Sequence, residues 1–281
     1  MPSPPRPLEA GFKINAISSV REISPAMIKF IQTVKPDEEP IVKPTRFSDT
    51  VKLYGFRAAI ITFTSEAYTL VKNALNRYEE LERVPLGCLK ALSSGGLGVF
   101  RSYFGSAASA MLTEVLIAGG VRYFLVIGAA GSISREVKAG DVVVPTWGLR
   151  EEGVSYHYVE PDVVVKPDPL ALRTLENSLA ETGLGFKTGG IWSTDAPFME
   201  TLSKVREYSD MGVLVVDMEM TDLMAVCMRR RVKLAGVVTV TDELYSGYWK
   251  PMFDSDVVTG SEKKVAYAVV KAGKKLSSKN V

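Results

Sequence analysis

The fold of this chain is decided by two stretches, Val215-Val216-Asp217-Met218-Glu219-Met220 and Val240-Thr241-Asp242-Glu243-Leu244. Each is an apolar, β-branched run that ends in acidic residues, which predicts a buried strand with carboxylates at its carboxyl end. Ligands of α/β proteins bind at this edge of the sheet. Because the chain has one histidine, we expect these carboxylates to carry the acid and base chemistry of a site.

On either side of these stretches, apolar runs and helix signals alternate along the chain. The predicted strands cover residues 57–63, 88–92, 97–104, 123–127, 141–145, 187–192, 213–217 and 234–239. The predicted helices cover residues 65–78, 106–117, 168–182, 221–231 and 262–274. This order, without an internal repeat, predicts an α/β fold: a single domain with a mixed, largely parallel twisted sheet flanked by helices.

The first 50 residues differ from the rest of the chain, because prolines recur along them. We predict a Pro-rich, extended N-terminal arm over residues 1–50, with a short helix near Pro25–Thr33, and a folded domain over residues 51–281. An arm that wraps a neighbouring subunit and a mobile tail both fit this pattern.

Composition argues against several classes of function. The 281 residues carry a net charge of +2, which is too weak to indicate binding to nucleic acid or to a membrane. No apolar run reaches the length of a membrane span. Cys88 and Cys227 stand at no metal-ligand spacing, so we expect reduced thiols, no metal site and a cytoplasmic protein. A single histidine also argues against a His-based metal site.

Two glycine-containing stretches are candidates for anion binding. The stretch Gly128-Ala129-Ala130-Gly131-Ser132 follows a predicted strand, and glycines in such a turn bring exposed N–H groups close to a ligand. Gly105 and Ser106 begin a predicted helix, with Ser106 as the expected N-cap, and the first N–H groups of a helix favour anions. An ordinary tight turn and a capped helix without a ligand are the alternatives.

Three side chains are candidates for contact with a substrate. Glu219 lies between methionines, and a carboxylate in such an apolar setting pairs with a cation or accepts hydrogen bonds from ligand hydroxyls. Asp242, at a strand end in a partly apolar cleft, is predicted to have a raised pKa and to act as a general acid. A turn or N-cap aspartate fits as well. His157 either touches a substrate or is a satisfied structural histidine.

Four stretches in this order resemble the nucleoside phosphorylase family, which includes purine nucleoside phosphorylases, uridine phosphorylases and methylthioadenosine nucleosidases. The stretches are Phe104-Gly105-Ser106-Ala107-Ala108, residues 128–132 with Gly140-Asp141-Val142-Val143, Asp217-Met218-Glu219-Met220, and Thr241-Asp242. Residues 153–158 and 192–198 look like a less studied branch of the same family. The resemblance covers about residues 57–245.

The resemblance implies an enzyme and assigns its site. It implies a pentosyltransferase that cleaves an N-glycosidic bond with phosphate as co-substrate and no cofactor, assembled as a homo-oligomer built from dimers, up to a hexamer. Asp242 and Glu219 correspond to the catalytic pair: Asp242 acts at N7 of a departing purine and Glu219 binds the ribose hydroxyls. The other assignments are Met218 and His157 to the ribose, Phe198 and Trp192 to the base, and Gly128, Ala129, Gly105 and Ser106 to the phosphate.

The anion site departs from the family pattern. Val126 stands where the purine and uridine enzymes carry an arginine, and Ala129 where they carry serine or threonine. Residues 62–66 lack the Gly-Asp-Pro-x-Arg phosphate loop. Other residues are expected to replace these, such as Arg101 or an arginine of a neighbouring subunit, for which Arg46 is a candidate.

The leading hypothesis is a nucleoside phosphorylase, which converts a nucleoside and phosphate into a free base and a pentose 1-phosphate. A purine is favoured, because Thr201 and Ser203 stand where uridine phosphorylases carry the glutamine and arginine that read uracil. The alternatives are a nucleosidase of the same family, which uses water, a uridine phosphorylase, and a nucleoside-binding protein without catalysis. No nucleic-acid or membrane partner is expected.

Overall fold

The buried β-branched runs form the strands of one mixed sheet. The computed structural model describes residues 40–279, and its strand order is β10-β9-β6-β7-β8-β5-β1-β4-β3-β2, with a further pairing of β9 with β5. The strands are β1 Ala58–Thr62, β2 Glu79–Glu80, β3 Cys88–Ser94, β4 Leu97–Ser102, β5 Tyr123–Ser132, β6 Val142–Glu151, β7 Lys187–Thr194, β8 Val213–Asp217, β9 Lys233–Glu243 and β10 Lys250–Pro251.

Five of these strands close on themselves. Because β9 pairs with both β5 and β6, the path β9-β6-β7-β8-β5 returns to β9. Closure removes the exposed strand edges that an open sheet would present. The longest pairing is the parallel one between β5 and β9, from Tyr123 opposite Lys233 to Ser132 opposite Glu243. It places Asp242, near the end of β9, opposite Gly131 of β5.

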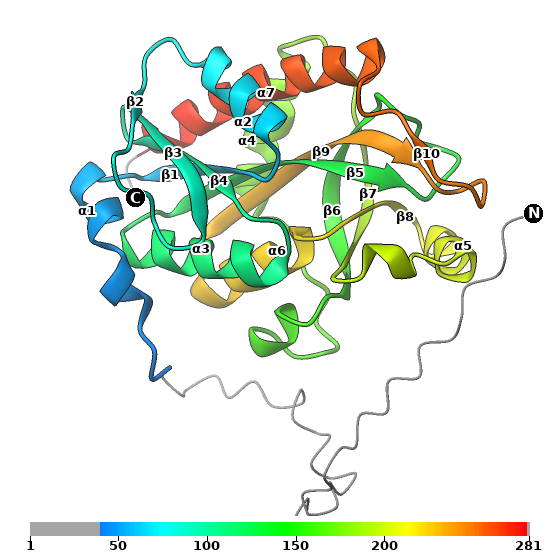
Figure 1. Cartoon of the computed structure of the whole chain (residues 1–281), viewed down its shortest axis with the longest axis horizontal. Coiled ribbons are helices and arrows are strands. Elements are labelled where there is room, and N and C mark those ends of the chain that lie inside the picture. Colours follow the sequence, from blue (N-terminus) through cyan, green and yellow to red (C-terminus); the bar gives the residue numbers. More distant parts are fainter. Residues whose placement is uncertain (1–39, 280–281) are drawn as a thin grey trace, which may run out of the picture.

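Helices cover both faces of the sheet (Figure 1). On one face lie α2 Ser65–Ala74, α4 Pro169–Ala180 and α7 Asp256–Ser277, and on the other α3 Ser106–Ala118 and α6 Met220–Arg230. The apolar side chains between the helices and the sheet are buried. Because helices cover both faces, the strands carry apolar side chains on both faces. The remaining helical elements are η2 Pro44–Phe47, α1 Asp49–Tyr54, η3 Ser155–His157, η4 Pro197–Met199 and α5 Leu202–Asp210.

The predicted α/β class is confirmed, as are most of the predicted strands and helices. Two of the differences have identifiable reasons. The prediction of a turn over residues 128–132 is wrong. These residues continue β5, because they pair with β9 as far as Ser132. The last helix begins at Asp256 rather than near residue 262, because the Ser255 hydroxyl caps it by accepting the Val258 N–H at 3.4 Å. Helix α5 was not predicted.

Most of the predicted N-terminal arm, including the helix expected near Pro25–Thr33, lies outside the described residues. The described end of the arm is not extended, since η2 packs against α3 and Ser48 is buried just before α1. The predicted boundary at residue 50 therefore falls inside α1. Among the helices of residues 40–279, none combines the length and the apolar character needed to cross a membrane.

Candidate active site

A cavity of about 470 Å³ opens at the ends of β1, β5, β8 and β9. This is the edge of the sheet that the two acidic stretches predict. Four carboxyl groups line the cavity, those of Glu200, Asp217, Glu219 and Asp242. Most of the remaining lining is apolar and includes Phe63, Phe104, Phe198, Met218, Trp249 and Phe253. Charges against such a wall interact strongly, because little water screens them.

Glu219 is buried, with 5% of its surface exposed. It occupies the N-cap position of α6, and its Oε1 accepts the Gly105 N–H at 2.7 Å. Burial, reinforced by the nearby Asp217 carboxylate, raises the pKa of Glu219 to about 8. At neutral pH the group therefore holds a proton for much of the time, and it is able both to donate a hydrogen bond to a ligand hydroxyl and to accept one.

Asp217 fixes the turn from β8 into α6. Its two oxygens accept the Ser193 hydroxyl at 2.5 Å and the Met220 N–H at 2.9 Å. The second bond satisfies one of the unpaired N–H groups at the start of α6. Burial raises the pKa of Asp217, and the hydrogen bonds oppose that shift. The turn holds Met218 against the cavity and Glu219 beneath the start of α3.

Asp242 accepts a hydrogen bond on each carboxylate oxygen. The Thr241 hydroxyl donates to Oδ1 at 3.0 Å and the Trp249 indole N–H donates to Oδ2 at 2.8 Å. Burial raises the pKa of Asp242, and both hydrogen bonds lower it by stabilising the charged form. A partly buried carboxyl group with a raised pKa, on the wall of a cavity, is suited to general acid catalysis.

Glu200 lines the cavity, although the sequence motifs do not indicate it. Burial, together with the charge of Asp242, raises the pKa of Glu200 to about 7. It follows η4, in the same segment as the predicted base-contacting residue Phe198, whose side chain is fully exposed at the cavity. Its position two residues after Phe198 was the available signal. Glu200 and Asp242 thus form a second pair of neighbouring carboxyl groups, beside the pair of Asp217 and Glu219.

Gly131 explains why the stretch 128–132 contains glycine. A Cβ atom on Gly131 would lie 3.0 Å from Asp242 Oδ2 and 2.5 Å from a methyl group of Leu244. The glycine therefore lets β5 approach the carboxyl group of Asp242 closely. The role expected from the sequence, a turn of exposed N–H groups around an anion, is wrong for this stretch, because its residues lie in a paired strand. Ala129 lines the cavity, and Gly128 does not.

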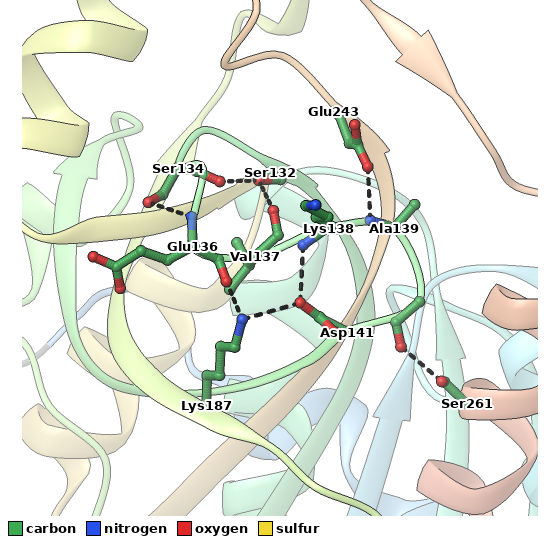
Figure 2. Close-up of polar contacts among 11 residues, drawn as sticks. Ser132, Ser134, Glu136, Val137, Lys138, Ala139, Asp141, Lys187, Glu243 and Ser261 are labelled. Atoms are coloured by element: carbon green, nitrogen blue, oxygen red, sulfur yellow. Dashed lines mark hydrogen bonds and ion pairs between the residues drawn. The ribbon is translucent and has the colours of Figure 1, made fainter.

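The loop between β5 and β6 holds the end of β9 from outside the cavity. Glu243 accepts the Ala139 N–H at 3.1 Å. Figure 2 shows this bond and the bonds from the Ser132 hydroxyl to two carbonyl groups of the loop. Glu243 directly follows Asp242, and successive side chains of a strand point to opposite faces. The loop therefore anchors one face of the strand end while Asp242 on the other face borders the cavity.

The family model of the phosphorylase superfamily matches residues 57–272, a range that contains all four cavity carboxyl groups. The chain belongs to this superfamily. The match confirms the resemblance that the sequence motifs indicated. It covers the whole closed set of strands as well as α2, α3, α4 and α6.

Among curated members of the superfamily, a guanosine phosphorylase of Halorubrum lacusprofundi is 30% identical over 152 residues, which cover 54% of this chain and 63% of the relative. A DeoD-type purine nucleoside phosphorylase of Bacillus cytotoxicus is 25% identical over 140 residues, which cover 50% of this chain and 60% of the relative. The chain therefore spans less than two thirds of the length of these relatives.

Solved structures of the superfamily share the fold. A purine nucleoside phosphorylase from Toxoplasma gondii, in complex with immucillin-H, has a TM-score of 0.73 at 20% identity, covering 80% of this chain and 93% of that chain. A uridine phosphorylase from Vibrio fischeri ES114 has a TM-score of 0.71 at 16% identity, and the match covers 85% of this chain and 100% of that chain. At these identities the likeness supports the architecture alone.

Gly105 and Ser106, predicted to bind phosphate, already bind carboxylates. Gly105, with a φ of 94°, is the N-cap of α3, and its N–H donates to Glu219. Ser106 is the first residue of the helix and makes no capping bond; its hydroxyl donates to Asp195. Asp195 also accepts the Gly153 N–H at 2.8 Å. These two residues therefore position Glu219 and the start of α3, and their predicted phosphate role is not met.

Two further predicted contacts lie outside the cavity. The predicted base contact of Trp192 is wrong, because its side chain is fully buried. Its indole N–H donates to Glu151 at 2.8 Å, and its ring packs edge-on against Tyr208 with centroids 4.9 Å apart. His157 is exposed at the end of η3 and does not line the cavity of its own chain, so its predicted sugar contact is not met there.

The described lining of the cavity contains no lysine or arginine. Arg101, predicted as a replacement anion ligand, lies next to one end of it: its Nε donates to the carbonyl of Phe63 at 3.4 Å, and Phe63 lines the cavity. Arg46 lies in η2, against α3. Within residues 40–279, no group of three or more His, Cys, Asp or Glu side chains is placed to hold a metal ion.

Proposed function

We propose that the protein is a nucleoside phosphorylase that cleaves purine nucleosides, releasing the free base and a pentose 1-phosphate. The observation that carries the proposal is the placement of Glu219 and Asp242 on the wall of one cavity, at the strand ends where the superfamily match lies. The names of the curated relatives, guanosine phosphorylase and purine nucleoside phosphorylase, support the same activity.

The two acids divide the chemistry. Cleavage of a glycosidic bond builds positive charge on the sugar and negative charge on the base. Glu219, buried and held by Gly105, binds the sugar hydroxyls, and in its ionised form it stabilises the positive sugar. Asp242 in its protonated form donates to the ring nitrogen of the departing base. Met218 packs on the sugar, since it lines the cavity directly before Glu219.

The purine preference rests on Glu200 as well as on Asp242. A carboxylate accepts hydrogen bonds only, so ionised Glu200 matches a base edge that presents N–H groups, as the six-membered ring of guanine does. Phe198, exposed at the cavity, offers its ring for stacking on the base. Together with Asp242 at the opposite ring nitrogen, these groups favour a 6-oxopurine over a pyrimidine.

Replacing Glu200 by Gln tests this assignment. The pKa of Glu200 lies near 7, so we expect the KM of the natural enzyme for guanosine to fall as the pH rises through this value and the carboxylate forms. The Gln variant loses a charge-assisted bond, which raises the KM about tenfold and removes this pH dependence. Steady-state kinetics from about pH 6 to pH 8 measures both. Glu207→Gln, on the exposed side of α5, is the control, and a pH-dependent KM in the Glu200 variant would contradict the assignment.

Phosphate needs a cation that the described cavity lining does not supply, and Arg101 is the candidate within this chain. Its guanidinium donates to the carbonyl of Phe63, which lines the cavity together with Thr64. We expect Arg101→Ala to raise the KM for phosphate by about tenfold to a hundredfold, because a charge-assisted bond contributes roughly 1.5–3 kcal/mol. The KM for the nucleoside should change little.

Lys90 provides a matched control for Arg101. It stands opposite Arg101 in the pairing of β3 with β4, is exposed, and does not line the cavity. Lys90→Ala should therefore leave the phosphate KM unchanged. An unchanged phosphate KM in both variants would exclude Arg101 and direct attention to an arginine of a neighbouring subunit, in line with the homo-oligomer that the sequence resemblance implies.

One observation favours a second candidate function, hydrolysis by a nucleosidase. The absence of lysine and arginine from the described cavity lining suits water as the nucleophile better than a phosphate dianion. A panel of purine and pyrimidine nucleosides, each incubated with and without phosphate, tests both functions. The proposal predicts purine release that depends on phosphate. Equal release without phosphate supports the nucleosidase, and release of pyrimidines alone contradicts the purine assignment.

A further inference from the structure

After β9 the chain folds back over the end of its own strand. We name residues 244–255 the strap. It turns at Gly247, which has a φ of 87°, and its short strand β10 then pairs antiparallel with β9, with Pro251 opposite Asp242. The Met252 N–H donates to the Thr241 carbonyl at 2.9 Å. Figure 1 shows β10 beside the end of β9 at the edge of the molecule. This path brings Trp249 to the wall of the cavity.

Trp249 is held by polar contact rather than by burial. Its side chain is 65% exposed, and its ring contact in the strap is with Phe253, at 6.2 Å between centroids. A large aromatic ring left in water gains little from the hydrophobic effect. The directed contact is the 2.8 Å bond from the indole N–H to Asp242 Oδ2. The same oxygen, Asp242 Oδ2, lies next to Gly131 of β5. Both residues line the cavity.

We propose that Trp249 is a positioning residue for Asp242. The indole N–H of Trp249 holds Oδ2 of Asp242 until a purine enters the cavity and binds to that oxygen. The proposal rests on the proposed function for the role of Asp242. It explains why an exposed tryptophan is tied to the general acid by one neutral donor. It also makes entry of the base and release of the acid a single event.

The proton balance follows from the donor count of the group. Ionised Asp242 accepts both the Thr241 hydroxyl and the Trp249 N–H. Oδ2 becomes a donor when it binds a proton from solvent, a step that an entering purine favours by accepting the hydrogen bond from that proton, and the indole N–H is then released to water. Transfer of that proton to the base restores the carboxylate, which again accepts the indole N–H once the base has left. No oxidant, reductant or further reactant is needed.

Other charged groups around Asp242 set the pH at which this exchange occurs. Glu200, in the segment after η4, interacts electrostatically with Asp242, and it also feels the charges of Glu151 and of Lys204 in α5. Asp217 and Glu219 line the same cavity from the turn between β8 and α6. The neighbouring pair of Glu243 and Lys250, 3.4 Å apart, links β9 to the strap on the far face. None of the described ion pairs involves Asp242 itself, so the tryptophan is its donor from the strap.

Fluorine NMR of enzyme labelled with 5-fluorotryptophan tests the link without any turnover. The chain has three tryptophans, Trp147, Trp192 and Trp249, and the signal lost in Trp249→Phe identifies the third. We expect this signal to shift in one step as the pH is varied, and to move when guanosine is added without phosphate. The step should vanish in Asp242→Asn and persist in Glu200→Gln. A Trp249 signal that does not titrate, or that titrates equally in Asp242→Asn, overturns the proposal.

Kinetics then tests the consequence for catalysis. Trp249→Phe keeps an aromatic ring and removes the donor that favours ionised Asp242, so the pH above which kcat/KM falls should move upward. Tyr248→Phe is the control, because Tyr248 is an exposed aromatic residue of the same strap that does not line the cavity; its profile should match the natural enzyme. Superposed profiles of Trp249→Phe and the natural enzyme overturn the proposal. If no nucleoside is cleaved, the proposed function fails, and the NMR titration still decides whether Trp249 and Asp242 are linked.

Discussion

Replacing Asp242 by Asn is expected to lower kcat for purine nucleosides by about a hundredfold or more, the contribution of a positioned general acid. The physical reason is that an amide keeps the size and the acceptor oxygen of the side chain but carries no transferable proton. The departing base then leaves as an anion without help at its ring nitrogen. Because Thr241 and Trp249 donate to this group, the Asn side chain retains at least one partner, and we expect the variant to fold.

The pH dependence gives the same assignment a second test. Burial raises the pKa of Asp242 above its ordinary value, so the active, protonated form is present at low pH and is lost as the pH rises through the raised pKa. The natural enzyme should therefore lose kcat/KM at the basic side of its profile, and Asp242→Asn should not show that loss. Asp210→Asn, exposed at the end of α5, is the control. Near-normal cleavage of guanosine by Asp242→Asn would remove Asp242 from the mechanism.

Replacing Glu219 by Ala is the second change with a large expected effect. The variant loses the group that binds the sugar hydroxyls, each charge-assisted hydrogen bond being worth roughly 1.5–3 kcal/mol, so kcat/KM for ribosides should fall by about a hundredfold or more. Substrates without 2′- and 3′-hydroxyls should lose much less. Steady-state kinetics on a riboside and on its 2′,3′-dideoxy counterpart measures the difference. Equal losses on both would exclude the sugar-binding role.

Glu219→Gln separates the charge from the shape. The amide oxygen still accepts the Gly105 N–H, so the start of α3 stays in place, while the side chain can no longer ionise. The pKa of Glu219 is raised to about 8 in the folded protein. The folded state therefore becomes less stable as the pH rises from the pKa of Glu219 in the unfolded chain to about 8, because the group must then ionise while buried. The melting temperature of the natural protein should fall over this range more steeply than that of Glu219→Gln. Parallel curves would show that Glu219 is not the titrating group.

The sequence was informative wherever burial and periodicity act locally. The runs that end in Asp217 and Asp242 predict buried strands with carboxylates at their ends, and both strands end in the cavity. The resemblance adds Met218 and Phe198, which also line it. These residues follow strands or sit in short segments whose direction is fixed by the sheet. Their placement therefore needs little knowledge of the rest of the chain.

The misplaced residues depend on contacts between distant segments. The stretch 128–132 has the composition of a turn, yet pairing with β9, about a hundred residues later in the chain, keeps it extended. Trp192 faces the side of β7 that Tyr208 of α5 covers, and α5 itself was not predicted. Glu200 and Trp249 reach the cavity through η4 and the strap, whose paths are set by turns and side-chain bonds rather than by a period.

The expected phosphate site departs furthest from the pattern of the family. Three features of the family pattern are replaced in the sequence, and in the described structure two of the groups expected to bind an anion, Gly105 and Ser106, donate to carboxylates instead. The acids, by contrast, keep their place on the cavity wall. The nucleophile therefore distinguishes the two candidate reactions: phosphate in phosphorolysis and water in hydrolysis.

Phosphorus NMR of the enzyme turning over guanosine in phosphate buffer tests this point most directly. For a phosphorylase, we expect inorganic phosphate to be consumed in step with guanine release and a pentose 1-phosphate signal to grow in equal amount. Without phosphate, guanine release should stop. Continued release without phosphate, with free ribose as the sugar product and no new phosphorus signal, would exclude phosphorolysis and make the protein a nucleosidase.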